Sequence, residues 1–108
     1  MSNNEKIARF CGWTTVNGSI WESPAQLRML IGCDAFTKDH NLFIEAWNKG
    51  VEAFTPELKR RVKDRGIPSM ITVDEDKIFR ALNLLPYEFI LEKRLPILIN
   101  IIDFLEKV

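Results

Sequence analysis

The stretch that decides the fold class is residues 13–22, which read WTTVNGSIWE. β-Branched and aromatic residues, which favour strands, stand on both sides of Asn17-Gly18. Asn-Gly between two such runs is the strongest short-range signal for a two-residue hairpin turn. The stretch therefore predicts a small antiparallel sheet in the N-terminal part of the chain.

A two-residue turn also sets the register of the hairpin. It places Thr14 opposite Trp21 and Thr15 opposite Ile20. With Trp13 at its start, the predicted sheet carries two tryptophans that are available to cover a helix.

Helical patterns surround this hairpin. Residues 3–11 carry apolar side chains at helical spacing, with Asn3 or Asn4 as the cap and Gly12 as the end. Residues 25–37 fit either a helix, begun by a Ser-Pro cap, or a third strand. A clear helix begins at Asp39, and its apolar residues keep the i, i+3/i+4 pattern as far as residue 54.

Prolines mark the expected starts of later helices. Residues 55–65 begin with a threonine cap, Pro56 at the first helical position and an acidic first turn, and so predict a separate helix. Thr72 or Asp74 caps the next helix, and Pro86 is expected at the first position of the last one.

These patterns predict an α+β fold that is mostly helical, with a small N-terminal antiparallel sheet packed against helices. We expect a single domain over residues 1–108, with a helix and the sheet in residues 1–37 and helices in residues 38–108. Fifteen Lys+Arg balance fifteen Asp+Glu, and 46% of the residues are hydrophobic. This composition excludes a disordered polyelectrolyte and a strongly basic nucleic-acid coat.

The sequence also predicts a cytoplasmic protein without a membrane partner. The most apolar run, Leu95 to Leu105, is too short to cross a bilayer. The polar N-terminus lacks the charged and apolar regions of a secretion signal. Cys11 and Cys33 are therefore expected to be reduced thiols that serve as small core residues.

Motifs for chemistry are missing from the sequence. His40 is the single histidine, so a Cys/His zinc site is not expected. The glycines form no phosphate-binding loop, and no nucleophile motif is present. A thiol pair of Cys11 with His40 lacks a third orienting group. We expect no cofactor, no metal and no catalytic residue.

Positive charge concentrates on one short helix of this neutral chain. Residues 55–69 hold five positive and two negative side chains, a net charge of +3. The segment is either a solvated helix face or a surface for an acidic protein or a nucleic acid. The predicted partner-binding residues are Lys59, Arg60, Arg61, Lys63 and Arg65.

The last helix carries two apolar stripes, which cover more of its surface than a one-sided helix needs. It is either a central core helix or a helix that packs one stripe inside and uses the other to form a homodimer. The predicted self-association residues are Leu91, Leu95, Leu98, Ile102 and Leu105.

The N-terminal half resembles a family. The matching features are Ile7-Ala8, Gly12-Trp13, Trp21-x-Ser23-Pro24, Phe36 and Asp39-His40-Asn41. Over about residues 4–54, this pattern is similar to short uncharacterised proteins of bacteriophages and prophages of the phage ABA sandwich type. The resemblance implies a small antiparallel sheet between helices and an origin in a mobile element, and it implies no activity.

We therefore expect a non-enzymatic accessory protein that binds a host macromolecule, for example an inhibitor of a host defence or regulatory protein. One alternative is a nucleic-acid-binding module that uses the basic residues 59–65. Another is a small-molecule-binding protein with a pocket between Trp13, Trp21 and Trp47.

Overall fold

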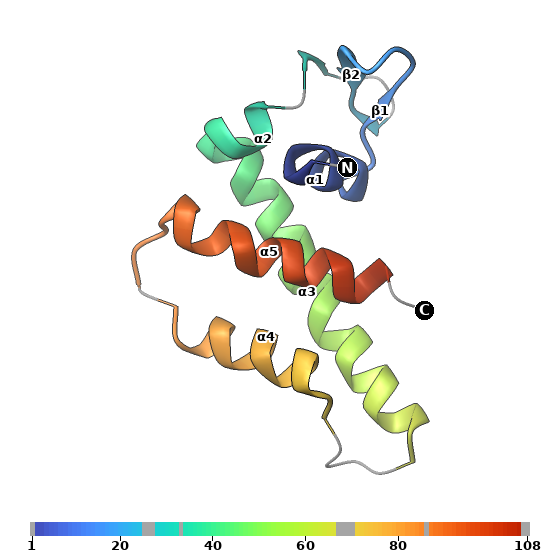
Figure 1. Ribbon diagram of the computed structural model, residues 1–108, viewed down its shortest axis with the longest axis vertical. Helices are drawn as coiled ribbons and strands as arrows, with labels where there is room; N and C mark the ends of the chain where they lie inside the picture. Colours follow the sequence, from blue (N-terminus) through green and yellow to red (C-terminus); the bar gives the residue numbers. More distant parts are fainter. Residues whose placement is uncertain (1, 25–27, 33, 67–70, 86, 107–108) are drawn as a thin grey trace. The chain divides into compact units, whose positions relative to one another are not determined.

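The computed structural model describes residues 2–24, 28–32, 34–66, 71–85 and 87–106 (Figure 1). These residues confirm a mostly helical α+β fold with a small antiparallel sheet. The helices are α1 (Asn3–Phe10), α2 (Ala35–Lys38), α3 (His40–Asp64), α4 (Val73–Asn83) and α5 (Leu91–Glu106). The strands are β1 (Thr14–Thr15), β2 (Ile20–Glu22) and β3 (Met29–Ile31). The chain divides into two compact units, residues 1–49 and 50–108, and α3 runs through the division.

The hairpin of β1 and β2 forms, but the predicted register is wrong by one residue. Thr14 lies opposite Glu22, and Thr15 lies opposite Trp21. The cause is the Asn17 side chain, whose Oδ1 accepts hydrogen bonds from the backbone N–H of Ser19 and of Ile20, at 2.9 and 3.1 Å. These bonds close a turn that is longer than the expected two residues.

Residues 25–37 fitted either a helix or a third strand, and residues 29–31 form the strand, β3. β2 is the central strand, and β3 pairs with it antiparallel, with Trp21 opposite Leu30. The predicted helix cap at Ser23 has a different role here. The Ser23 hydroxyl accepts a hydrogen bond from the Arg28 backbone N–H at 2.7 Å, and the Ser23 N–H donates to the Arg28 carbonyl. Ser23 thus closes the connection between β2 and β3, of which residues 25–27 lie outside the described residues.

The core of the first unit forms around its tryptophans. The Trp21 side chain is only 1% exposed, and the Arg9 guanidinium of α1 lies 5.3 Å from the centre of its ring. The Trp13 ring meets the Phe36 ring of α2 edge-on, with the ring centres 5.4 Å apart. Such edge-to-face pairs stabilise beyond the area they bury. As predicted, both tryptophans of the sheet region are buried against helices.

Side-chain caps explain most helix starts. Asp39 caps α3 as predicted, since its Oδ1 accepts from the backbone N–H of Asn41 at 2.9 Å. Thr72 is the cap of α4, one of the two residues expected there. The cap of α1 is Ser2 rather than Asn3 or Asn4, because the Ser2 hydroxyl accepts from the Glu5 N–H.

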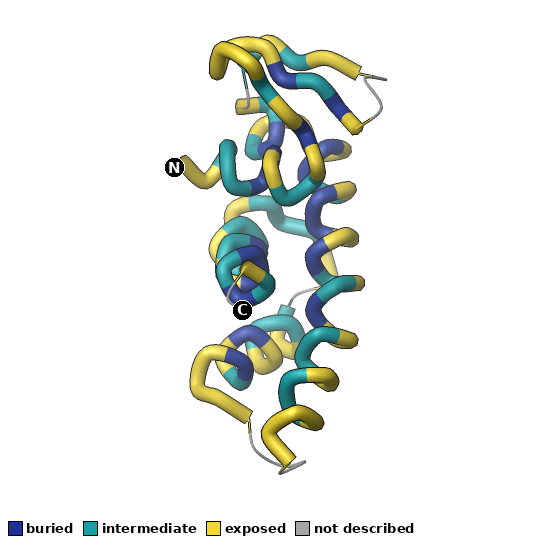
Figure 2. The backbone as a smooth tube through the Cα atoms, turned by 90° about the vertical axis from the view of Figure 1, so that its right-hand side faces the viewer, coloured by how far each residue is buried: buried dark blue, intermediate teal, exposed yellow. Residues whose placement is uncertain are grey.

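α3 is one continuous helix through Pro56, so the prediction of a separate helix from residue 55 was wrong. Val51, Phe54 and Leu58 lie on one stripe of α3 and all join the same apolar cluster. Their burial outweighs the backbone hydrogen bond that a proline removes inside a helix. Figure 2 shows exposed and buried positions alternating along α3, which is typical of a helix covered on one side.

α5 also differs from its predicted start. It begins at Leu91, and the residues just before it are not helical, so the expected start at Pro86 was wrong. Pro86 itself lies outside the described residues. The Ile90 carbonyl accepts from the N–H groups of Lys93 and Arg94 and so begins the helical hydrogen bonds.

The core of the second unit joins the C-terminal part of α3 to α4 and α5. Its buried members are Phe54, Ile78, Ile101 and Phe104. The rings of Phe54 and Phe104 meet edge-on at 5.2 Å. Half-buried apolar residues pack around this cluster, namely Val51, Leu58, Leu82, Ile97 and Leu105.

The continuous α3 makes a prediction for Pro56, which is exposed on the helix surface. Substitution Pro56→Ala should raise the free energy of unfolding by ~1–3 kcal/mol, because a proline inside a helix costs about 3 kcal/mol relative to alanine. Urea unfolding followed by circular dichroism measures it. The matched control is Thr55→Ala, which should change little. Loss of about 1 kcal/mol in the control, with no gain at Pro56, would instead support a helix start at Thr55.

Candidate binding surfaces

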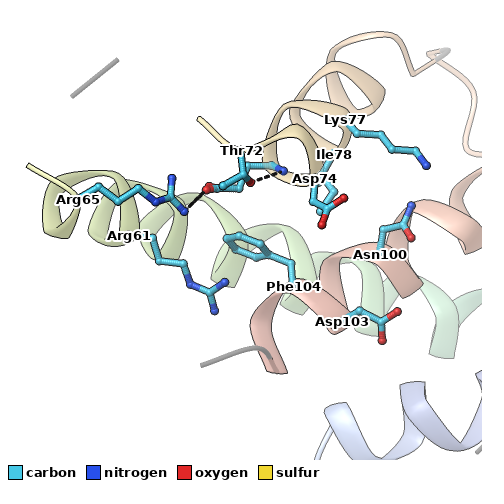
Figure 3. Close-up of a pocket in the computed structure, with 10 residues that line it drawn as sticks. Arg61, Arg65, Thr72, Asp74, Lys77, Ile78, Asn100, Asp103 and Phe104 are labelled. Carbon is cyan, nitrogen blue, oxygen red and sulfur yellow. Dashed lines mark hydrogen bonds and ion pairs between the residues drawn. The ribbon is translucent and has the colours of Figure 1, made fainter. Parts of the chain in front are cut away.

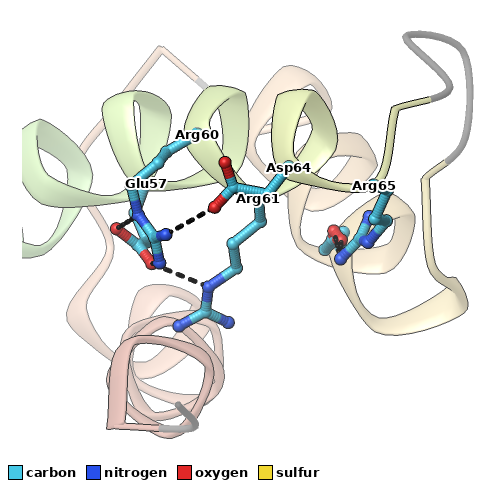
Figure 4. Close-up of polar contacts among 6 residues, drawn as sticks. Glu57, Arg60, Arg61, Asp64 and Arg65 are labelled. Carbon is cyan, nitrogen blue, oxygen red and sulfur yellow. Dashed lines mark hydrogen bonds and ion pairs between the residues drawn. The ribbon is translucent and has the colours of Figure 1, made fainter.

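Three of the five basic residues of this α3 segment form ion pairs with carboxylates of the same chain (Figure 4). Arg60 donates to Glu57 Oε1 at 2.6 Å through Nη2 and to Asp64 Oδ2 at 2.8 Å through Nη1. Arg61 donates to the same Glu57 oxygen through Nε at 2.8 Å. Two arginines therefore share one glutamate on the surface of a single helix.

Glu57 responds strongly to these neighbours. Hydrogen bonds from Arg60, and then from Arg61, lower the pKa of its carboxyl group to about 2. The Glu57 carboxylate is thus ionised throughout the physiological pH range. Because it stays charged, it offsets one of the five positive charges of this segment, and the net charge of residues 55–69 remains +3.

Arg61 and Arg65 also connect α3 to the other two helices of the second unit. The Arg61 guanidinium lies 4.1 Å from the centre of the Phe104 ring on α5, a cation–π contact. Arg65 Nη2 donates to Glu75 Oε2 on α4 at 3.0 Å. The three predicted arginines therefore act within the chain. Lys59 and Lys63 are exposed, and in the described part of the chain no ion pair is formed by either.

A polar cavity of about 320 Å³ opens between the end of α3, the start of α4 and α5 (Figure 3). Arg61, Arg65 and Lys77 supply positive charge to its wall. Asp74, Glu75 and Asp103 supply an equal negative charge. Thr72, Ile78, Asn100 and Phe104 complete the lining. Because the opposite charges balance, the lining does not favour an anion over a cation.

Glu75 is the buried carboxylate of this cavity, with 1% of the residue exposed. Burial alone would raise the pKa of Glu75, but the ion pair and hydrogen bond with Arg65, together with hydrogen bonds from Thr72, lower it overall. Both oxygens of Glu75 contact Arg65. This arrangement stabilises the junction of α3 and α4, and we assign the cavity's central pair a structural role.

The predicted self-association stripe is mostly covered within the chain. Leu98 and Ile102 are fully buried. Leu91, Leu95 and Leu105 are half-buried, and Leu105 packs against the core of the second unit. This burial favours the core interpretation of α5, and self-association through the stripe stays a prediction.

The three tryptophans of the predicted pocket are buried side chains, and a pocket between them stays a prediction. Trp13, Trp21 and Trp47 are each buried. A shallow cavity borders Trp13, but its lining comes from Arg28, β3 and the start of α3 and does not include Trp21 or Trp47.

Cys11 is half-buried rather than a core residue, and its thiol is not poised for reaction. Burial raises the pKa of Cys11 to about 11, with Lys49 opposing this shift. A thiol with such a pKa is almost entirely protonated at neutral pH and is a poor nucleophile. Cys33 lies outside the described residues.

A surface that the sequence analysis missed lies on the outer side of the sheet. Ile31 is 96% exposed, Met29 63% and Ile20 41%, and Val16, directly after β1, is fully exposed. Ile20 pairs with Ile31 across the strands, and Met29 is two residues from Ile31 on β3, so these three side chains share one face of the sheet. The signal was available in the sequence, since strand alternation puts Ile20 on the face opposite to buried Trp21.

Wider comparisons leave the function open. Comparison with protein-family models, with curated proteins and with solved structures finds no match to this chain. Among the described helices, none has both the length and the apolar character needed to cross a bilayer. Within the same residues, no group of three or more histidine, cysteine or acidic side chains is placed to hold a metal ion.

The Arg65–Glu75 pair makes a prediction about pH. In Arg65→Met, the Glu75 carboxylate stays buried without its cation, so its pKa should rise above the usual value. The variant should be less stable than the parent at pH 7. The deficit should shrink as the pH falls and Glu75 becomes protonated, because the parent loses the contribution of its low-pKa carboxylate while the variant recovers.

Urea unfolding of both proteins at pH 4 and pH 7 measures this difference. The control is Arg80→Met, whose ion pair with Asp76 is exposed and should contribute little at either pH. A stability loss in Arg65→Met that is independent of pH would show that Arg65 acts through packing alone.

Proposed function

We propose that this chain is a non-enzymatic binding protein that recognises a partner protein through the outer face of its sheet. The observation that carries the proposal is the apolar surface of Val16, Ile20, Met29 and Ile31. An exposed apolar patch of this size on a soluble protein is often an interaction site.

The charge arrangement supports a protein partner over a nucleic acid. Nucleic-acid binding depends on basic side chains that neutralise phosphates. Of the five predicted basic residues, Arg60, Arg61 and Arg65 already contact carboxylates of this chain. Only the two lysines of that segment remain for phosphate contacts, whereas the sheet face is apolar.

The resemblance of residues 4–54 to phage proteins supports a host protein as the partner. In that setting the chain acts in the host cytoplasm as an accessory protein that occupies a surface of a defence or regulatory protein. If the partner binds the sheet, the other two predicted surfaces are not needed for binding. The basic segment and the α5 stripe would then have structural roles within the chain.

Affinity capture from a bacterial lysate with three baits tests the proposal. The parent chain and Val73→Asp should retain the same protein, and Ile31→Asp should lose it by at least about tenfold, because a buried unpaired charge opposes binding. Val73 is the matched control, since it is an exposed β-branched residue, 85% exposed, on α4. Circular dichroism confirms that all three baits are folded.

Two outcomes would overturn the proposal. In one, no captured protein depends on Ile31. In the other, the chain binds a labelled DNA or RNA oligonucleotide at low salt, and Lys59→Ala with Lys63→Ala removes that binding while Ile31→Asp does not.

A further inference from the structure

The outer edge of β3 is open in the structure. The sheet order is β1-β2-β3, so β3 pairs on one side only, with β2. An edge strand presents backbone N–H and C=O groups that a further strand can pair with. In the described part of the chain, nothing else pairs with β3.

The hydrogen bonds between β2 and β3 identify which backbone groups face that edge. The Ser23 N–H donates to the Arg28 carbonyl at 2.9 Å, and the Gly32 N–H donates to the Ser19 carbonyl at 2.5 Å. In an antiparallel pair, hydrogen-bonded positions alternate with positions whose groups point away. Leu30 therefore bonds to β2, and the N–H and C=O groups of Met29 and Ile31 point to the open edge.

The same two residues also carry the exposed apolar side chains of β3. Met29 and Ile31 are 63% and 96% exposed. Edge strands of soluble proteins are usually protected by lysine, proline or an inward charge. β3 has none of these, since its residues are Met29, Leu30 and Ile31. Both its backbone edge and its outer side chains are thus available at the same two positions.

We propose that an extended segment of the partner protein adds to the sheet as a fourth strand beside β3. This inference rests on the proposed function and deepens it by naming how the partner is held. The added strand pairs with the backbone of Met29 and Ile31, and its alternate side chains extend the apolar row formed by Ile20 and Ile31. Backbone hydrogen bonds then provide affinity, and the apolar row provides selectivity.

The size of the surface favours such a segment over a second copy of this chain. Burying a fully exposed aliphatic side chain removes roughly 60–120 Å² from water, so the four exposed residues offer roughly 200–400 Å². A stable interface needs about 800 Å² on each side. A symmetric dimer through β3 would form similar backbone hydrogen bonds, but the two sheets would lie edge to edge and leave the apolar face of each copy uncovered, so it would bury even less than this area. A partner protein can also cover that face with residues that flank its added strand.

The neighbouring charges define the segment further. β3 itself carries no charge, which favours β-branched or other apolar residues at alternate positions of the partner. Glu22 lies directly across from Met29 on the same face of the sheet. Glu22 is one strand further in than β3, so only a long cationic side chain that reaches past Met29 would approach its carboxylate. The cavity that borders Met29 and Leu30 is also lined by Arg28, Asp39 and Glu45, so both signs of charge lie near this end of β3.

Amide hydrogen exchange measured by NMR tests this proposal. In the chain alone, the amides of Met29 and Ile31 should exchange much faster than that of Leu30. The probe is the blocked peptide KTVTVTVTK with alternate residues N-methylated, which keeps one hydrogen-bonding edge and limits its self-association. In excess, it should slow exchange at Met29 and Ile31 by at least about tenfold.

The matched control is the same peptide with every central residue N-methylated, which has no hydrogen-bonding edge and should give no protection. Unchanged exchange at both amides, or equal protection by the control peptide, would overturn strand addition. Protection that grows with protein concentration without any peptide would identify a second copy as the occupant and also overturn it.

These outcomes are separable from those of the capture experiment. If strand addition fails but the proposed function holds, the captured protein still depends on Ile31 while the exchange of Met29 and Ile31 is unaffected. If the proposed function fails, no captured protein depends on Ile31, whatever the peptide does to the two amides.

Discussion

Burial of the Trp21 side chain is the constraint on which the first unit depends. Its ring is covered on the inner side of the sheet, beneath Arg9 of α1. Because side chains alternate along a strand, burying Trp21 turns its neighbour Ile20 to the opposite face. Cross-strand pairing then carries the same orientation to Ile31 on β3. A single buried aromatic residue thus determines that an apolar row faces outward.

That row explains why the function proposed here is binding rather than chemistry. A surface of aliphatic side chains supplies no proton donor, nucleophile or metal ligand, but it does gain free energy when a partner covers it. The open backbone edge of β3 adds directional hydrogen bonds to that gain. The two features coincide at Met29 and Ile31, and together they describe a site suited to an extended chain.

The second unit depends on electrostatic contacts that a count of charges along its sequence does not predict. Residues 55–69 look like a basic surface when their charges are counted along the chain. In the fold, Arg60 and Arg61 share Glu57 on α3, Arg61 covers Phe104, and Arg65 reaches Glu75 on α4. These contacts join α3 to both other helices of the unit. Two of the charges that suggested a partner, those of Arg61 and Arg65, thus also connect the helices of this unit, and partner binding by the segment stays a prediction.

Local signals predicted those parts of the structure that depend on neighbouring residues. The hairpin, the helix caps at Asp39 and Thr72 and the α+β class follow from residue types and their spacing. The register was missed because it depends on side-chain hydrogen bonds inside the turn, made by the Thr15 hydroxyl and by Asn17 Oδ1. The prediction of a helix start at Pro56 also followed from local signals, since a threonine cap, a proline and an acidic residue are typical of the first turn of a helix. It was wrong because packing in the core of the second unit keeps α3 continuous.

What the sequence by itself determined is the hairpin, the starts of α3 and α4 and the α+β class, because these depend on residues that are neighbours in the chain. Only the tertiary structure decided that α3 continues through Pro56, because the packing of Phe54 and Leu58 into one core outweighs a local break. It alone decided which charges remain for a partner, since Glu75 lies ten residues from Arg65 and meets it only after folding. For the candidate site, strand alternation indicated the outward face of Ile20, but only the fold placed Met29 and Ile31 beside it, because residues 25–37 fitted either a helix or a strand until β3 paired with β2.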